Sequence, residues 1–252
     1  MSFAGSADAY DRFMGRYSVR LAPSFADFAG VAPGQSVVDV GCGPGALTTE
    51  LVQRLGSTAV AAVDPSEQFV TAARERHPGV DVQRAAAEEL PFAANEFDAA
   101  LAQLVVHFMA DPGRGLAEMA RVTHPGGVVA ACVWDHAGGR TPLAPFWDAV
   151  HELDPDAMDE SQMAGGRDGQ IAALLTDIGL RQVEQTALPV SVEHATFEEW
   201  WEPFTLGVGP AGAYVRSLDP DRQEELRQRC RERLGPGPFA LESRAWTARG
   251  SV

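Results

Sequence analysis

A glycine-rich turn between a short apolar run and a helical segment is the feature that most constrains this chain. Residues 37–40 read VVDV, residues 41–45 read GCGPG, and leucines then recur every four residues as far as Gly56. The pattern predicts a strand, a tight turn and a helix with Gly56 at its C-cap. Glycine lacks a Cβ, so a ligand can approach the backbone closely at such a turn. A tight turn without a ligand is the alternative.

Apolar runs and helical periods alternate along the rest of the chain. This alternation predicts an α/β fold in which crossover helices join parallel strands of a doubly wound sheet. At about 150 residues per domain, 252 residues correspond to one α/β domain with an elaboration. The predicted units are an N-terminal helical segment at 1–30, a core at 31–192 and 235–252, and a small helical cap at 193–234. The further predicted strands are 59–63, 80–84, 97–104, 128–134, 183–192 and 239–247, and Ser66 is expected to cap the helix after the second strand.

Charge and cysteine usage exclude several classes of protein. The net charge is −15, and all 20 basic residues are arginine. Electrostatic binding to nucleic acid or to an anionic membrane is therefore not expected. The three cysteines are far apart, and no run of about 18 apolar residues or N-terminal apolar stretch occurs, so a cytoplasmic protein with reduced thiols is predicted.

A carboxylate after the second predicted strand favours a ligand site at the glycine turn over a turn without a ligand. Asp64 follows Gly45 by 19 residues, where a carboxylate can accept hydrogen bonds from ribose hydroxyls. The turn lacks the G-x-x-G spacing of the dinucleotide fingerprint, which disfavours a nicotinamide-dependent oxidoreductase. A nucleoside-containing ligand of another kind is the leading hypothesis.

Several motifs together resemble one enzyme family. They are VVDVGCGPGALT at 37–48, VDPS at 63–66, EELPF at 88–92, FDAA at 97–100 and HPGG at 124–127. In content, order and spacing they resemble the class I S-adenosylmethionine-dependent methyltransferases, and most of all the small-molecule enzymes related to quinone biosynthesis. The resemblance implies a seven-strand sheet whose last strand is antiparallel.

The resemblance also implies roles for single residues. The methionine part of S-adenosylmethionine would meet Asp39, Gly41 and Gly43, its ribose would meet Asp64, and its adenine would meet Pro65 and Ser66. Related enzymes usually have Gly-Asp-Ala after the third strand, where this chain has three alanines at 85–87. There the backbone of Ala87 and the carboxylate of Glu88 are expected to contact adenine, while Gln103 would lie beside the sulfonium. Tyr17 or Arg16 would contact the methionine carboxylate, or else their helix only packs on the sheet.

In methyl transfer the protein mainly aligns the nucleophile with the methyl group, because the cofactor supplies the electrophile. A general base is needed only for an acceptor that is protonated at neutral pH. His107, after the fourth strand, is the first candidate and His136 the second; packing histidines are the alternative. No metal site is expected, although Asp135 leaves a catechol-type metal open.

The expected partner is a small-molecule methyl acceptor. Aromatic residues after the fifth strand predict an apolar or aromatic acceptor, or else simply the core of the cap. These residues are Phe146, Trp147, Trp200, Trp201 and Phe204. The alternative function is an S-adenosylmethionine-binding protein with a regulatory or non-methylating role.

Overall fold

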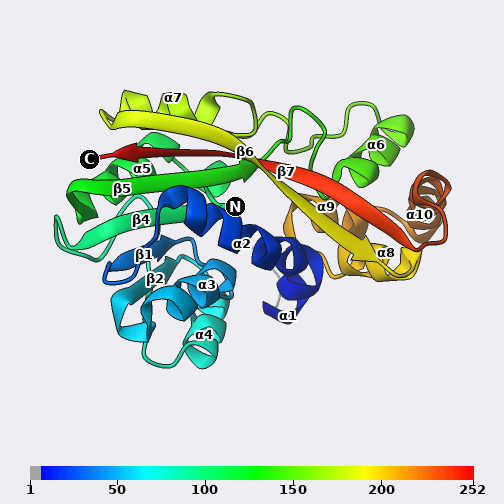
Figure 1. Cartoon of the computed structure of the whole chain (residues 1–252). Helices are drawn as coiled ribbons and strands as arrows, with labels where there is room; N and C mark the ends of the chain where they lie inside the picture. The colour runs from blue at the N-terminus through cyan, green and yellow to red at the C-terminus, as the bar shows by residue number, and fades with distance from the viewer. Residues whose placement is uncertain (1–6) are drawn as a thin grey trace.

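The chain folds around one seven-strand sheet (Figure 1). The computed structural model describes residues 7–252, so the first six residues of the predicted N-terminal segment lie outside the described residues. The strand order is β3-β2-β1-β4-β5-β7-β6, and β7 runs antiparallel to both of its neighbours. This confirms the predicted mostly parallel sheet with an antiparallel last strand. The strands are β1 (Val37–Val40), β2 (Val60–Asp64), β3 (Asp81–Arg84), β4 (Phe97–Gln103), β5 (Thr123–Trp134), β6 (Arg181–His194) and β7 (Phe239–Ser251).

Helices cover both faces of the sheet. The cluster with Leu21 and Leu51 packs α2 and α3 on one face, and Val70 adds α4 to the same face. Leu116 and Leu175 pack α5 and α7 on the opposite face. Because both faces are covered, all four residues of β1 are buried and apolar except Asp39. The helical segments of this core are α1 (Ala7–Tyr10), η1 (Asp11–Gly15), α2 (Arg16–Ala29), α3 (Ala46–Leu55), η2 (Ser57–Ala59), α4 (Glu67–Arg76), η3 (Val106–Phe108), α5 (Pro112–Val122) and α7 (Gln170–Asp177).

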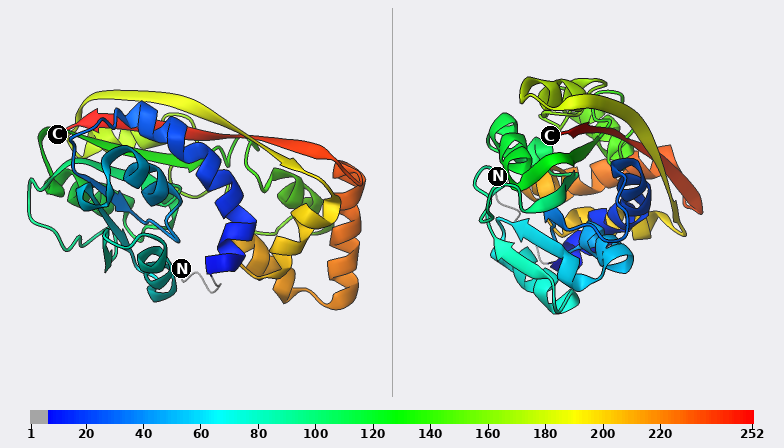
Figure 2. Two further views of the ribbon diagram at one scale, coloured as in Figure 1. Left: turned by 60° about the horizontal axis from the view of Figure 1, so that its bottom comes forward. Right: turned by 60° about the vertical axis from the view of Figure 1, so that its left-hand side comes forward.

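The long antiparallel pair β6–β7 extends beyond the rest of the sheet and holds the cap at its far end. Both strands continue beyond β5 and end among the cap helices (Figure 2). The inserted helices are α8 (Phe197–Thr205), α9 (Gly209–Ser217) and α10 (Pro220–Leu234), within the predicted insertion. The helix α6 (Ala144–Leu153), which the prediction left in the core, shares the cap's apolar cluster through Phe146 and Val150. Two insertions therefore build the cap.

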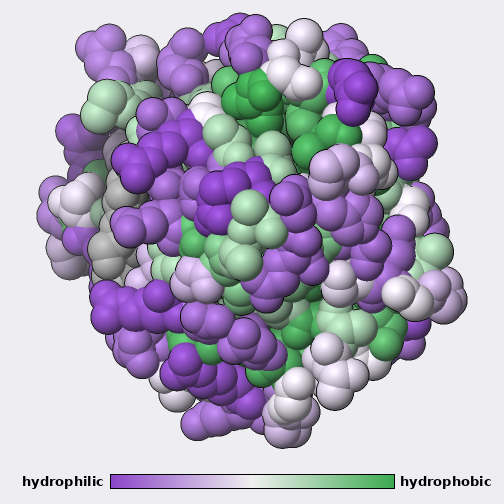
Figure 3. All heavy atoms as spheres, turned by 90° about the vertical axis from the view of Figure 1, so that its left-hand side faces the viewer, coloured by the Kyte–Doolittle hydropathy of each residue, from purple (hydrophilic) through white to green (hydrophobic). Residues whose placement is uncertain are grey.

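Few large hydrophobic residues are exposed among residues 7–252. On the face shown in Figure 3, hydrophobic residues form only small separate areas. Val19 and Met158 are the exposed large hydrophobic residues among residues 7–252. Within the same residues no helix is long and apolar enough to cross a membrane.

Candidate active site

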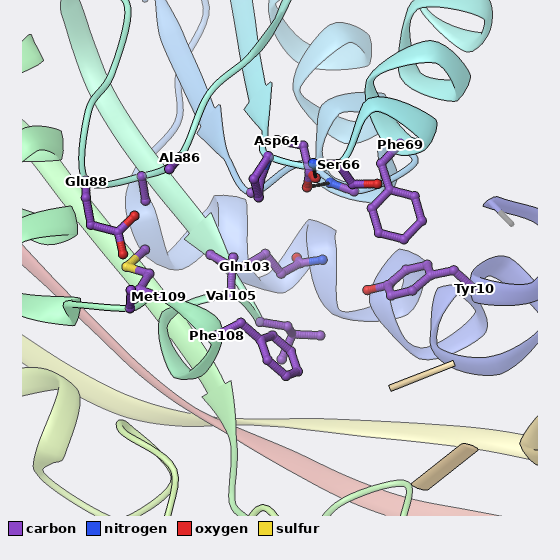
Figure 4. A pocket seen from close by; sticks show the side chains of 16 residues that line it. Tyr10, Asp64, Ser66, Phe69, Ala86, Glu88, Gln103, Val105, Phe108 and Met109 are labelled. Atoms are coloured by element: carbon purple, nitrogen blue, oxygen red, sulfur yellow. Dashed lines mark hydrogen bonds between the residues drawn. The ribbon is translucent and has the colours of Figure 1, made fainter. Parts of the chain in front are cut away.

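A cavity of about 470 Å³ lies where β1, β2 and β4 end (Figure 4). The chain crosses to opposite sides of β1 on its way to β2 and to β4, so this is the switch point at which doubly wound sheets bind ligands. We call it the main cavity. Eight of the ten predicted cofactor contacts line it: Gly41, Gly43, Asp64, Pro65, Ser66, Ala87, Glu88 and Gln103.

The glycine turn forms one wall of the main cavity. Gly41 and Gly43 have φ values of 74° and 54°, in the left-handed region that favours glycine. A Cβ on Gly41 would overlap the side chain of Val105, whereas a Cβ on Gly43 would meet no atom within 4 Å. The turn therefore needs glycine for its backbone conformation at both positions, and at Gly41 also for space.

Asp64 is fixed at the end of β2 by the turn itself. Its Oδ2 accepts a hydrogen bond from the Gly43 N–H at 2.9 Å, and its Oδ1 accepts one from the Ser66 N–H at 2.8 Å. The residue is 6% exposed, and burial raises the pKa of its carboxyl, while the two backbone N–H groups oppose that shift. Each oxygen keeps a second lone pair that a ligand hydroxyl can use. Ser66 occupies the N-cap of α4 as predicted, but its hydroxyl makes no capping bond.

Gln103 presents an unsatisfied acceptor at the tip of β4. Its Nε2 donates to the carbonyl of Ser18 at 3.1 Å, which fixes the amide. Its Oε1 is buried and has no hydrogen-bond partner within residues 7–252. A buried polar atom without a partner is rare, and in a cavity wall it indicates a ligand contact. Figure 4 shows the side chain beside the middle of the cavity.

The alanines after β3 leave an open wall. Ala86 and Ala87 line the main cavity with methyl groups only. Glu88 also lines it, and its Oε1 accepts a hydrogen bond from the Asp111 N–H at 3.1 Å. The carboxylate that the sequence predicts as a substitute for the missing aspartate is therefore present but partly engaged.

Other lining residues were not predicted from the sequence. Tyr10 and Phe69 approach edge to face, with ring centroids 5.4 Å apart, and their rings lie at the same end of the cavity (Figure 4). The remaining ones lie between the end of β4 and the residues just after η3: Leu104, Val105, Phe108, Met109 and Ala110. Their position directly after the predicted fourth strand is the signal that could have identified them.

The prediction for Tyr17 does not fit the structure. Its hydroxyl lies 2.8 Å from His194 Nε2, and the ring packs against Trp134 away from the main cavity. Arg16 is held by His194 Nδ1 at 2.8 Å and by Glu199 at 2.6 Å. Both side chains join α2 to the base of the cap. Neither Tyr17 nor Arg16 lines the main cavity, because both lie on a face of α2 that points away from it. Tyr10 lines the main cavity instead.

Asp39 also lies outside the main cavity wall. It is 1% exposed, and its Oδ2 accepts a hydrogen bond of 2.6 Å from the Thr48 hydroxyl. Burial raises the pKa of this carboxyl to about 7. Asp39 therefore anchors the first turn of α3 and does not line the main cavity.

His107 and His136 line a second, smaller space of about 40 Å³, which we call the side chamber. Their ring centroids are 5.3 Å apart. Burial lowers the pKa of both, to about 4 for His136 and well below the usual value for His107, so both are neutral at pH 7. His107 Nδ1 and His136 Nε2 are buried without hydrogen-bond partners within residues 7–252.

Asp135 is a structural residue. Its carboxylate accepts hydrogen bonds from Arg244 Nε, Trp246 Nε1 and the Gly138 N–H at 2.8, 2.9 and 2.9 Å. These contacts tie the end of β5 to β7. Within residues 7–252 no group of three or more histidine, cysteine, aspartate or glutamate side chains could hold a metal ion.

The aromatic residues of the cap form its core rather than a wall of either space. Phe146 stacks on Phe204 with centroids 4.6 Å apart, and Trp147, Trp200 and Trp201 are buried in the same cluster. None of them lines the main cavity or the side chamber. The packing interpretation is therefore the one that fits.

The part of the chain that builds the main cavity also matches a known family. Residues 38–131 match the family described as "Methyltransferase domain". The matched part runs from β1 to β5 and so includes the strands that surround the main cavity. This family match supports S-adenosylmethionine as the cofactor.

The chain is also similar in sequence to two bacterial methyltransferases and in fold to a solved structure. An uncharacterized methyltransferase of Mycobacterium tuberculosis is 36% identical over 135 residues, which cover 54% of this chain and 52% of that protein. A demethylmenaquinone methyltransferase of Renibacterium salmoninarum is 34% identical over 110 residues, covering 44% of this chain and 46% of that protein. The chain thus spans about half the length of the curated relatives it matches. A SAM-dependent methyltransferase from Aquifex aeolicus has the same fold, with a TM-score of 0.53, 20% identity and coverage of 70% of this chain and 87% of that one.

Proposed function

We propose that this protein is a methyltransferase that transfers a methyl group from S-adenosylmethionine to a small organic molecule. One observation carries the proposal: the glycine turn, Asp64 and the unsatisfied Gln103 meet around a single cavity at the switch point of the sheet. The residues fit the cofactor, because Gly43 leaves open space beside the turn and Gln103, whose buried Oε1 has no partner within residues 7–252, lines the same cavity. Nucleic acid is not the expected partner of a chain with a net charge of −15.

The walls suggest how the cofactor would be held. The free lone pairs of Asp64 would accept the two ribose hydroxyls, with Pro65 and Ser66 against the adenine. Phe69 adds an aromatic edge, and Ala87 and Glu88 would contact the adenine from the β3 side. Gln103 would lie beside the sulfonium, where its Oε1 supplies a partial negative charge.

The chain's residues mainly align the reactants and exclude water. S-adenosylmethionine supplies a methyl group already activated on a sulfonium, so in-line displacement needs correct approach of the nucleophile. The ring of Phe108 and the side chains of Leu104 and Val105 line the cavity without polar atoms, which keeps competing water away. A residue that accepts a proton is needed only when the acceptor carries one at neutral pH.

Finer assignments are part of the same proposal. The likeness to a demethylmenaquinone methyltransferase supports the quinone-biosynthesis type over about half of that protein. The three cysteines are buried and unpaired, which supports a reducing, cytoplasmic location.

The first experiment is calorimetric titration of the purified protein with S-adenosylmethionine, S-adenosylhomocysteine and NAD. We expect micromolar binding of the first two and none of NAD. Absence of binding by both adenosyl compounds would refute the proposal. If the protein binds both adenosyl compounds and a candidate acceptor but forms no methylated product, the non-methylating role is favoured instead.

A further inference from the structure

The side chamber brings together several buried polar atoms that have no hydrogen-bond partner within residues 7–252. Besides the two histidines, Glu160 lines it and is 3% exposed; its carboxyl lies close to the Trp147 indole, but its buried Oε2 makes no hydrogen bond of good geometry within residues 7–252. Glu160 comes from the irregular segment between α6 and α7, whereas the histidines follow β4 and β5. Three separate segments thus place unsatisfied polar atoms around one space. Each such atom costs free energy unless a ligand or water satisfies it.

The side chamber adjoins the main cavity. Tyr10, Leu104 and Phe108 line both spaces, so a molecule in the chamber lies next to the proposed cofactor. Leu104 has a φ of 60°, a left-handed conformation that is strained for a bulky residue. Its N–H donates to the carbonyl of Cys132 at 2.9 Å, which holds this backbone against β5. Strain maintained at a shared wall is typical of a functional site.

The walls determine which ligand chemistry fits. Apart from the three polar residues, the chamber is lined largely by apolar and aromatic side chains, including Phe13, Trp134 and Leu143. Among the described residues that line the chamber or the main cavity, none is an arginine, and the chain has no lysine. A carboxylate or phosphate would meet no counter-charge and would lie beside Glu160. The space of about 40 Å³ admits the polar end of a molecule, while the rest extends along the shared aromatic wall.

We infer that the side chamber binds the methyl acceptor, an uncharged phenol, with its hydroxyl between His107 and His136 and with Glu160 positioning it. The inference rests on the proposed methyl transfer and deepens it. His107 lies on η3, the short helical turn that follows β4, and it is the residue that receives the proton. Burial raises the pKa of Glu160 to about 7, so its protonated carboxyl can donate a hydrogen bond to the phenol oxygen while the phenol O–H donates to His107.

The proposed methyl transfer leaves the net charge of the site unchanged. The phenol oxygen forms a bond to the methyl carbon as the sulfur–carbon bond breaks, and the hydroxyl proton passes to His107. One positive charge is present before the step, on sulfur, and one after it, on the imidazolium. A neutral histidine in the ground state suits this step, because no second cation is buried next to the sulfonium.

The test uses wild-type protein loaded with S-adenosylhomocysteine and a panel of small aromatic probes. Phenol, 4-methylphenol and 2-naphthol represent the inferred class, with 4-methylbenzoate and 4-methylbenzylamine as charged counterparts. We expect at least one phenol to bind, and 4-methylbenzoate to bind at least tenfold more weakly than 4-methylphenol. Absence of phenol binding, or equal binding of the benzoate, would overturn the inference.

Variants then separate the roles, with S-adenosylmethionine and the phenol that binds most tightly. His107→Gln should lower kcat at least 100-fold and leave cofactor affinity within twofold, because a positioned base contributes about 10²–10⁴-fold. Glu160→Gln should raise KM at least tenfold and change kcat by less than threefold. The controls His124→Gln and Glu225→Gln lie away from both spaces and should change neither constant.

The inference and the proposed function fail differently. Methylation of a charged acceptor but of no phenol would leave the function intact and overturn the inference. Unchanged kcat in His107→Gln together with unchanged KM in Glu160→Gln would also overturn it. Failure of wild-type protein to bind S-adenosylmethionine would remove the proposed function itself.

Discussion

Replacing Asp64 by alanine tests the proposed cofactor site most directly. The carboxylate is anchored by the N–H groups of Gly43 and Ser66 and keeps lone pairs for the ligand. A hydrogen bond to a charged group contributes about 1.5–3 kcal/mol. Since a tenfold change corresponds to about 1.4 kcal/mol, loss of a single ribose contact should weaken S-adenosylmethionine binding about 10- to 150-fold.

The same substitution affects stability, so the assay must separate the two effects. Asp64→Ala leaves two backbone N–H groups without their acceptor but removes a buried charge, and these changes oppose each other. Calorimetric affinity should therefore be measured beside chemical denaturation of the unliganded protein. Asp81→Ala, at the exposed start of β3, is the matched control and should leave affinity unchanged. An Asp64→Ala affinity within twofold of wild type would refute the ribose contact.

Three further predictions follow from the geometry. Gly41→Ala should destabilise the protein by about 1–3 kcal/mol in denaturant unfolding, because φ is 74° and the new Cβ overlaps Val105; Gly43→Ala, with open space, should cost less. Tyr17→Phe should lower stability by about 1 kcal/mol and leave cofactor affinity unchanged, since its hydroxyl bonds His194; a clear loss of affinity would contradict this placement. Burial lowers the pKa of His136 from 6.5 to about 4, so the unfolded state binds the proton more tightly and stability should fall by up to about 3 kcal/mol between pH 6.5 and 4. In His136→Gln, unfolding measured across that range should show a smaller slope.

Local patterns predicted the centre of the site well. The glycine turn and Asp64 each follow a strand closely, and the carboxyl ends of neighbouring parallel strands meet at one edge. Gln103, at the end of β4, lines the main cavity for the same reason. The order of the strands then fixes which residues face one another, so the part of the site after β1, β2 and β4 followed from short stretches of sequence.

Errors arose where the direction of a side chain mattered. Tyr17 and Tyr10 are both on the N-terminal helical segment, but only the packing of that segment on the sheet decides which one reaches the cavity. Asp39 points beneath the turn, where Thr48 accommodates it. Glu160 was not predicted, because nothing in the irregular segment around it indicates that it lines the same chamber as His107 and His136.

The sequence by itself determined the sheet, its switch point and the cofactor turn, because apolar periodicity and glycine conformation act over a few neighbouring residues. Only the tertiary structure decided the composition of the cap and the existence of the side chamber. The cap is built from two insertions that share one apolar cluster, and the chamber is lined by residues from distant segments. Contacts of that kind depend on how whole elements pack, and packing at long sequence separation leaves no local pattern to read.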